Sequence, residues 1–120
     1  MDRREVGARA EALAARFLES SGYRIVHRNY LIKAGEIDLV AHAPDGTLCF
    51  VEVRMRTGAD HGTPAETVGA AKQRRVIAAA RHYLAARVRG EPPCRFDVVA
   101  ITASGDRTSV QHIPDAFRLD

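Results

Sequence analysis

Apolar and polar residues alternate along the two halves of segment 35–56, which a tight turn interrupts. Pro44, Asp45 and Gly46 form that turn, because proline presets the backbone and glycine supplies a left-handed residue. This turn pairs Ala43 with Thr47 and fixes the register of a hairpin. One face of the hairpin is then entirely apolar, and it consists of Ile37, Leu39, Ala41, Cys49, Val51 and Val53. We expect this face to lie on a hydrophobic core.

The other face of the hairpin is charged at the open end and apolar near the turn, at Val40, Leu48 and Phe50. The predicted register sets Asp38 opposite Glu52, and Glu36 opposite Arg54. Two carboxylates opposite each other repel, and a hard cation such as Mg²⁺ would relieve that repulsion. The alternative is a solvated polar end of a sheet in which Arg54 neutralises a carboxylate.

The first twenty residues have helical periodicity. Apolar residues recur at three- and four-residue spacing between Asp2 and Ser21, and Gly22 ends the predicted helix. Glu11 falls at the edge of the apolar stripe, from where its carboxylate could reach a site at the rim of a sheet. The alternative is a solvated glutamate at the edge of the helix.

A second helix is predicted from Thr63 to about Val88, because Thr63-Pro64-Ala65-Glu66 has the pattern of a capping box. Lys72 and Gln73 fall inside its apolar arc. Either the stem of Lys72 runs out along the edge of the core, or its ammonium reaches an acidic site. The outer face is basic, with Arg74 and Arg75, and could follow a phosphate backbone, although solvated helix faces have similar compositions.

The remaining segments predict strands at 23–30, 94–102 and 107–113, followed by a tail that docks through Phe117. Asp97 interrupts the apolar run of the second of these strands, and Arg95 is its expected partner. The resulting order is α-β-β-β-α-β-β, which predicts an α/β domain with a mixed central sheet flanked by helices. At 120 residues the chain has the length of a single domain, residues 1–120.

Composition narrows the function classes only slightly. The net charge of +3 is compatible with a polyanionic partner. Arginine greatly outnumbers lysine, and because coding bias produces the same excess we give it little weight. Cys49 and Cys94 match no metal-ligand spacing and are expected to be buried free thiols in a reducing compartment. No apolar segment has the length of a membrane span or the pattern of a secretory signal, so we expect a cytoplasmic protein without a membrane partner.

The charged end of the hairpin has the parts that phosphodiester hydrolysis needs. Residues two apart on a strand share a face at about 6.5 Å, so Glu52 and Arg54 could act on one phosphate group. Such a reaction uses a metal to lower the pKa of a water molecule, and positive charge to stabilise the oxygens of the transition state.

The motifs Gly35-Glu-Ile-Asp-Leu-Val and Phe50-Val-Glu-Val-Arg-Met-Arg resemble those of the YraN family of predicted endonuclease-like proteins. That family is similar to the archaeal Holliday-junction resolvases of the PD-(D/E)XK, restriction-endonuclease-like superfamily. The resemblance covers nearly the whole chain, including Lys72 and Arg95-Phe-Asp-Val-Val.

This resemblance implies a restriction-endonuclease-like fold and a nuclease that hydrolyses DNA, rather than RNA, with Mg²⁺ or Mn²⁺. It implies the metal ligands Glu11, Asp38 and Glu52, the last two also being catalytic. Branched or flapped DNA is the implied substrate. A homodimer follows by analogy with resolvases, which cut two strands symmetrically.

The chain departs from the superfamily pattern at one position, where Arg54 replaces the usual lysine. Arginine is always protonated and cannot act as a general base, but it can bind phosphate or stabilise charge. Lys72 is the candidate to replace the missing amine. Three hypotheses therefore remain, namely a metal-dependent nuclease, a nucleic-acid-binding module with little or no cleavage, and a protein-interaction module. Nucleic-acid contacts are assigned to Arg54, Arg56, Gln73, Arg74 and Arg75.

Overall fold

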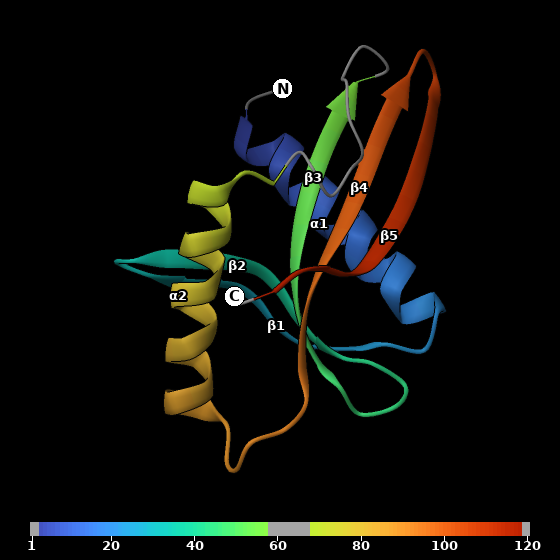
Figure 1. Cartoon of the computed structure of the whole chain (residues 1–120). Coiled ribbons are helices and arrows are strands. Elements are labelled where there is room, and N and C mark those ends of the chain that lie inside the picture. The colour runs from blue at the N-terminus through green and yellow to red at the C-terminus, as the bar shows by residue number, and fades with distance from the viewer. Residues whose placement is uncertain (1–2, 58–67, 119–120) are drawn as a thin grey trace.

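A computed structural model describes residues 3–57 and 68–118 of the chain. Its elements follow the predicted order: α1 (Arg3–Ser20), β1 (Arg24–Ile32), β2 (Gly35–His42), β3 (Leu48–Thr57), α2 (Ala70–Arg87), β4 (Cys94–Ser104) and β5 (Arg107–Phe117). The five strands form one sheet in the order β1-β2-β3-β4-β5 (Figure 1). Only β3 and β4 pair in parallel, across the α2 crossover, so the sheet is mixed. The predicted α/β class and element order are confirmed.

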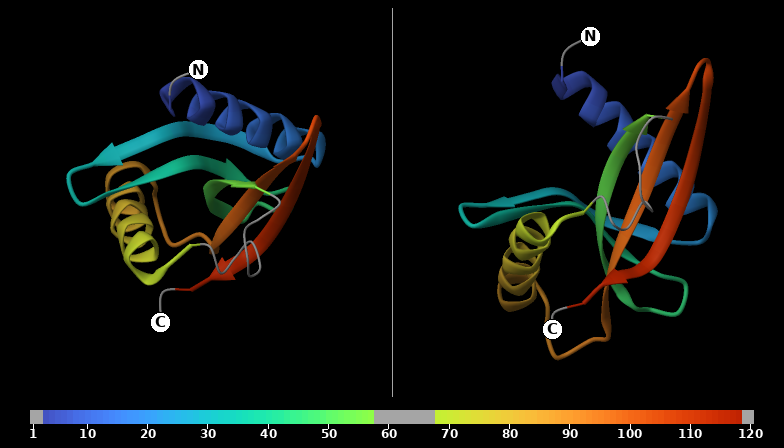
Figure 2. Two further views of the ribbon diagram at one scale, coloured as in Figure 1. Left: turned by 90° about the horizontal axis from the view of Figure 1, so that it is seen from above. Right: turned by 45° about the horizontal axis from the view of Figure 1, so that its top comes forward.

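The two helices cover opposite faces of the sheet, as Figure 2 shows from above. On the α1 face, small residues of the helix such as Ala14 and Ala15 pack with Leu39, Val51 and Val99. On the α2 face a core rich in aromatic side chains surrounds Phe50 and Tyr83. Within the described residues, no helix is long and apolar enough to cross a membrane.

The hairpin of β2 and β3 has the predicted register. Ala41 pairs with Cys49, and the amide of Ala43 donates to the carbonyl of Thr47 at 2.9 Å. Both faces of the hairpin are buried, and the assignment of all six apolar residues to one face was wrong. Ile37 was assigned to the same face as Leu39, yet it packs on the α2 side while Leu39 packs under α1. The regular alternation therefore breaks at the intervening residue, Asp38.

The second helix begins later than its sequence pattern suggested. Val68 and Gly69 are not helical, and Gly69 is the N-cap with an extended backbone and no side-chain cap. The predicted start at Thr63 is therefore wrong for residues 68–69, and the capping box at 63–66 lies outside the described residues. Val68 instead turns into the core on the α2 face.

Both the first and the last strands are longer than predicted. The first strand continues past residue 30 to Ile32, and the last continues past residue 113 to Phe117. The tail docks as expected, since Phe117 stacks on Phe96 with ring centroids 5.0 Å apart. Both cysteines are free thiols, but only Cys49 is buried, whereas Cys94 is exposed and so contradicts the expectation of two buried thiols.

Gly35 fixes how α2 sits against the hairpin of β1 and β2. A Cβ atom at this position would lie 1.8 Å from the carbonyl oxygen of Arg75 in α2, a distance that backbone atoms cannot tolerate. The helix therefore rests directly on the start of β2, next to Glu36. Only glycine allows this approach.

Replacing Gly35 by alanine should destabilise the protein by about 2–4 kcal/mol, because α2 must move away from β2. Gly7→Ala is the matched control, since a Cβ at this α1 position meets nothing within 4 Å. It should instead stabilise the protein by about 0.5–1 kcal/mol through helix propensity. Urea unfolding of both variants measures the difference, and equal midpoints would contradict the close contact.

Candidate active site

Strands β2 and β3 separate where their acidic residues begin. The last pair of the ladder between them is Leu39 with Val51, one residue before the predicted pair of Asp38 and Glu52. Beyond it, Oδ2 of Asp38 accepts a hydrogen bond from the backbone amide of Val53 at 2.8 Å. The carboxylate of Asp38 thus occupies the gap between the strands, bound to the backbone of the neighbouring strand.

Glu52 lies at the centre of this region and is 1% exposed. Lys72 approaches it from the first turn of α2, with Nζ 3.3 Å from Oε2 of Glu52 and 3.2 Å from Oε1 of Glu36. The inward ammonium of Lys72 therefore reaches an acidic site, as one of the two interpretations proposed. Sequence reasoning set Glu36 opposite Arg54 and missed its pairing with Lys72, although its place two residues before Asp38 indicated a shared location.

The carboxylates are held in a setting that disfavours their charge. Burial, and then the negative charge of Asp38, raise the pKa of Glu52 to about 8, against the opposing charge of Lys72. Burial also raises the pKa of Asp38, although the hydrogen bond from Val53 lowers it. Burial acts to lower the pKa of Lys72, but Glu52 and Glu36 outweigh it and raise that pKa. The lysine therefore remains a cation.

Glu11 adjoins the same cluster from α1. Its side chain is half-buried, and burial followed by the charge of Asp38 raises its pKa. A hydrogen bond from Asn29 opposes this shift. Asn29 has a left-handed backbone, with φ of 53°. The structure thus brings the predicted carboxylates Glu11, Asp38 and Glu52 into one electrostatic group, together with Glu36.

The predicted cationic residues divide into two groups. Arg54 belongs to the cluster, since its charge lowers the pKa of Asp38, and its buried Nε has no hydrogen-bond partner. Arg56 is half-buried two residues along β3, whereas Arg74 and Arg75 are exposed on the outside of α2. Gln73 has a structural contact, because its amide nitrogen donates to the carbonyl of Val68 at 2.8 Å.

The donor set of the cluster fits a hard divalent cation. Oε1 of Glu52 is buried without a hydrogen-bond partner, and carboxylate oxygens are the ligands that Mg²⁺ and Mn²⁺ prefer. The arrangement is not a preformed cage, however. In the described ranges 3–57 and 68–118, no three His, Cys, Asp or Glu side chains are grouped closely enough to hold a metal.

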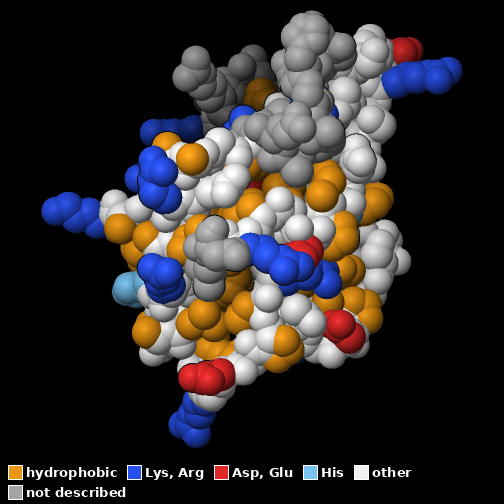
Figure 3. All heavy atoms as spheres, in the orientation of Figure 1, with side chains coloured by type: hydrophobic (Ala, Val, Ile, Leu, Met, Phe, Trp, Pro, Cys, Tyr) orange, Lys and Arg blue, Asp and Glu red, His pale blue; other side chains and the backbone are white. Residues whose placement is uncertain are grey.

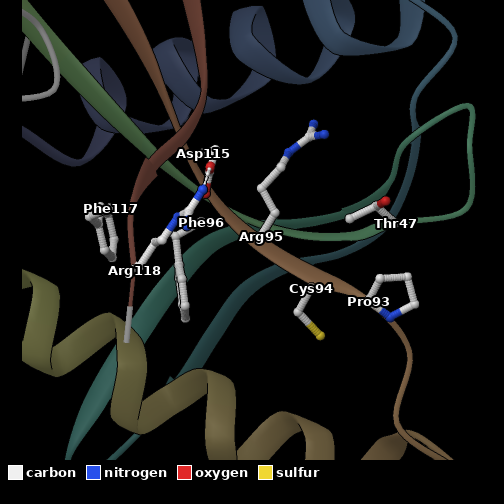
Figure 4. Close-up of a pocket in the computed structure, with 8 residues that line it drawn as sticks. All are labelled: Thr47, Pro93, Cys94, Arg95, Phe96, Asp115, Phe117 and Arg118. Atoms are coloured by element: carbon white, nitrogen blue, oxygen red, sulfur yellow. Dashed lines mark hydrogen bonds and ion pairs between the residues drawn. The ribbon is translucent and has the colours of Figure 1, made fainter. Parts of the chain in front are cut away.

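A second buried acid, Asp97, has an entirely different environment. Arg95 donates to both of its oxygens at 2.9 and 3.0 Å, as the sequence suggested, and His112 and the amide of Asp115 add further hydrogen bonds. An open pocket of about 650 Å³ lies beside this network (Figure 4). The two arginines of that pocket, Arg95 and Arg118, pair with Asp97 and Asp115. We therefore assign this region to structure rather than catalysis.

The two buried acids should respond oppositely to neutral substitution. Between pH 4.5 and about 8 an unfolded chain ionises Glu52 while the folded chain does not, so stability falls as the pH rises. In metal-free buffer at pH 7, Glu52→Gln should therefore stabilise the protein by about 1–3 kcal/mol.

Asp97→Asn is the comparison variant for the same measurement. The pKa of Asp97 is lowered by its hydrogen bonds to His112 and Arg95, which outweigh its burial. Its contribution is present above pH 4 and is lost as the pH falls further. At pH 7 this variant should lose about 3 kcal/mol, because the charge of Arg95 is left uncompensated. Thermal unfolding from pH 3 to 9 distinguishes the two cases, and destabilisation by Glu52→Gln would contradict this account.

Sequence comparison places the chain among known proteins. The Uncharacterised protein family UPF0102 matches residues 10–101, a range that includes every predicted site residue. A UPF0102 protein of Myxococcus xanthus is 47% identical over 97% of this chain and 91% of its own length. Relatives from Cupriavidus taiwanensis and Symbiobacterium thermophilum are 56% and 50% identical, covering 92% and 95% of this chain and 82% and 97% of their own lengths. The chain therefore belongs to the UPF0102, or YraN-like, family.

Proposed function

We propose that this protein is a metal-dependent nuclease that hydrolyses phosphodiester bonds of DNA. One observation carries the proposal: the buried carboxylate of Glu52 lies in the same electrostatic group as Asp38, with an unsatisfied oxygen and the Lys72 ammonium 3.3 Å away. A purely structural acid would be satisfied as Asp97 is. The resemblance to the PD-(D/E)XK superfamily supports the same function and a restriction-endonuclease-like fold.

Asp38 and Glu52 are the proposed ligands of a Mg²⁺ or Mn²⁺ ion, with Glu11 at the border of the site. When bound, the ion supplies Lewis-acid polarisation of the phosphate and a lowered pKa for a water molecule. The hydrogen bond from Val53 orients one oxygen of Asp38. The burial of Glu52 excludes water, which strengthens every charge interaction within the site.

Lys72 takes the part of the lysine that is missing from the Glu52-Val53-Arg54 triplet. Because Glu52 and Glu36 keep it protonated, it acts as a positive charge and not as a base. Its mobile four-carbon stem allows the ammonium to move from the carboxylates to a phosphate oxygen. Arg54, two residues from Glu52 on β3, supplies a second cation for the developing negative charge.

The outer surface of α2 is the proposed DNA-binding face. The helix has five basic residues and no acidic one, within the sequence AAKQRRVIAAARHYLAAR. Basic side chains project on the α2 side of the molecule in Figure 3. Arg74 and Arg75 are exposed there, two and three residues after Lys72. DNA phosphates bound by these arginines would lie within one turn of α2 from Lys72.

A nucleic-acid-binding module without cleavage is the second candidate. It is favoured by the contacts of Lys72, which neutralise Glu36 and Glu52 without any metal. Under this alternative the carboxylates hold α2 against the sheet. Removing the charges of Arg74 and Arg75 would then weaken binding, while Asp38→Asn would change nothing functional.

Asp38→Asn should reduce metal-dependent cleavage by about 100-fold or more, the scale of losing one preorganised charged group. The assay uses labelled single-stranded, duplex, flapped and four-way-junction DNA with Mg²⁺, Mn²⁺ or EDTA. Glu19→Gln is the control, because this α1 carboxylate is exposed and distant from the cluster in sequence. DNA binding should survive in both variants.

The outcomes of that assay separate the two candidates. Cleavage that requires both metal and Asp38 establishes a nuclease, and the preferred DNA defines its class. Binding without cleavage at any metal concentration supports the non-cleaving module instead. If the protein binds no DNA at low salt, it is neither a nuclease nor a nucleic-acid-binding module. The acidic cluster would then belong to a protein-interaction module.

Lys72→Met should have opposite effects on metal binding and on cleavage. The ammonium competes with a divalent cation for the oxygens of Glu36 and Glu52, so its removal should increase Mn²⁺ affinity severalfold. Cleavage should nevertheless fall by about 10–100-fold, because the cation that acts on phosphate is lost. Calorimetric titration with Mn²⁺ and single-turnover cleavage measure the two effects. Weaker Mn²⁺ binding would show that Lys72 supports the metal site rather than competing with it.

A further inference from the structure

The tip of the β1–β2 hairpin presents an apolar side chain to solvent. Ile32 pairs with Gly35, so Lys33 and Ala34 alone form the turn. Leu31, next to this turn, is 71% exposed. The other exposed large apolar residues in the described part of the chain, Val6 and Met55, are 37% and 46% exposed. All three ribbon views show the hairpin projecting past α2 (Figures 1 and 2).

The hairpin is attached to α2 on both of its strands, close to the turn. Tyr30 is 5% exposed, its hydroxyl hydrogen-bonds to Nδ1 of His82, and its ring meets that of Tyr83 edge to face at 5.0 Å. Gly35 lies against the backbone of Arg75 on the other strand. These contacts fix the hairpin beside its turn, and Leu31 stays outside the core that Tyr30 enters.

Leu31 is also close to the proposed active site. Its cross-strand partner is Glu36, whose carboxylate lies 3.2 Å from the ammonium of Lys72. Lys33, two residues after Leu31, is exposed in the turn, and Arg75 is an exposed residue of α2 whose backbone carbonyl lies against Gly35. The exposed Leu31 therefore lies near one cation, Lys33, and one cross-strand step from a carboxylate of the site.

We propose that Leu31 is a wedge that inserts between bases of DNA at a branch point, while Lys33 binds the adjacent phosphates. A single exposed leucine is common on protein surfaces, but this one is held near the end of a projecting hairpin, two residues from the exposed Lys33. Apolar side chains inserted between base steps unstack and kink DNA, and bases that are already unpaired are the easiest to unstack. The inference rests on the proposed function and names its substrate class, branched or flapped DNA.

The test measures base unstacking directly and does not require cleavage. DNA carrying 2-aminopurine at a flap junction, or in the middle of a matched duplex, is titrated with the protein in EDTA. Fluorescence should rise at the junction with the unmodified protein. Leu31→Ser should abolish the rise and weaken junction binding by about five- to tenfold, with duplex binding unchanged. Leu31→Phe should retain both signals, because a larger apolar side chain can still insert.

Val6→Ser is the matched control, since Val6 is an exposed apolar residue of α1, and it should behave like the unmodified protein. Sedimentation of each variant tests whether Leu31 instead contacts a second copy of the chain. A Leu31→Ser variant that dissociates a dimer but leaves the fluorescence rise intact overturns the wedge.

The wedge and the proposed nuclease can fail separately. Cleavage that depends on Asp38, together with junction fluorescence that does not depend on Leu31, overturns the wedge and leaves the nuclease standing. Junction unstacking that depends on Leu31 without any cleavage supports the wedge in a binding module. Failure to bind any of the DNA molecules overturns both.

Discussion

A carboxylate buried in an apolar layer needs a cation, and this requirement organises the molecule around Glu52. The acid lies on a central strand and is almost inaccessible to solvent, so it can ionise only with a compensating charge from within the protein. Lys72 supplies that charge from the helix α2, with which Glu52 forms an ion pair. The lysine reaches Glu52 because α2 rests directly on the sheet at Gly35. The helix position, the glycine and the ion pair therefore depend on one another. The unpaired Oε1 of Glu52 shows that this compensation is incomplete.

The site also depends on an interruption in the sheet. An unbroken ladder would point Asp38 and Glu52 side by side with their backbones paired. Instead the strands part after Leu39 and Val51, and the carboxylate of Asp38 takes the backbone amide of Val53 as its partner. The left-handed Asn29 on β1 lies close to this break. Acidic residues from three neighbouring elements can then adjoin one another without crowding their main chains.

Local patterns were sufficient to predict most of the fold and much of the cluster. The turn at Pro44–Gly46 fixed the hairpin register, and helical spacing placed Glu11 and Lys72 on inward-facing arcs. Features that depend on tertiary contact were missed. Ile37 changed face because the strands part at Asp38, which alternation cannot show. The pairing of Glu36 with Lys72 was missed because it joins elements that are far apart in the chain.

The parallel pairing of β3 with β4 has a consequence for the order of folding. Strands β1, β2 and β3 are joined by short turns. In contrast, Leu48 of β3 and its partner Cys94 of β4 are separated along the chain by the segment that contains α2. Closing such a long loop is slow compared with forming a hairpin. We therefore expect the three-stranded meander to assemble before Lys72 reaches Glu52. Docking of α2 then brings Lys72 to Glu36 and Glu52, so the last folding step also supplies the acidic cluster with its cation.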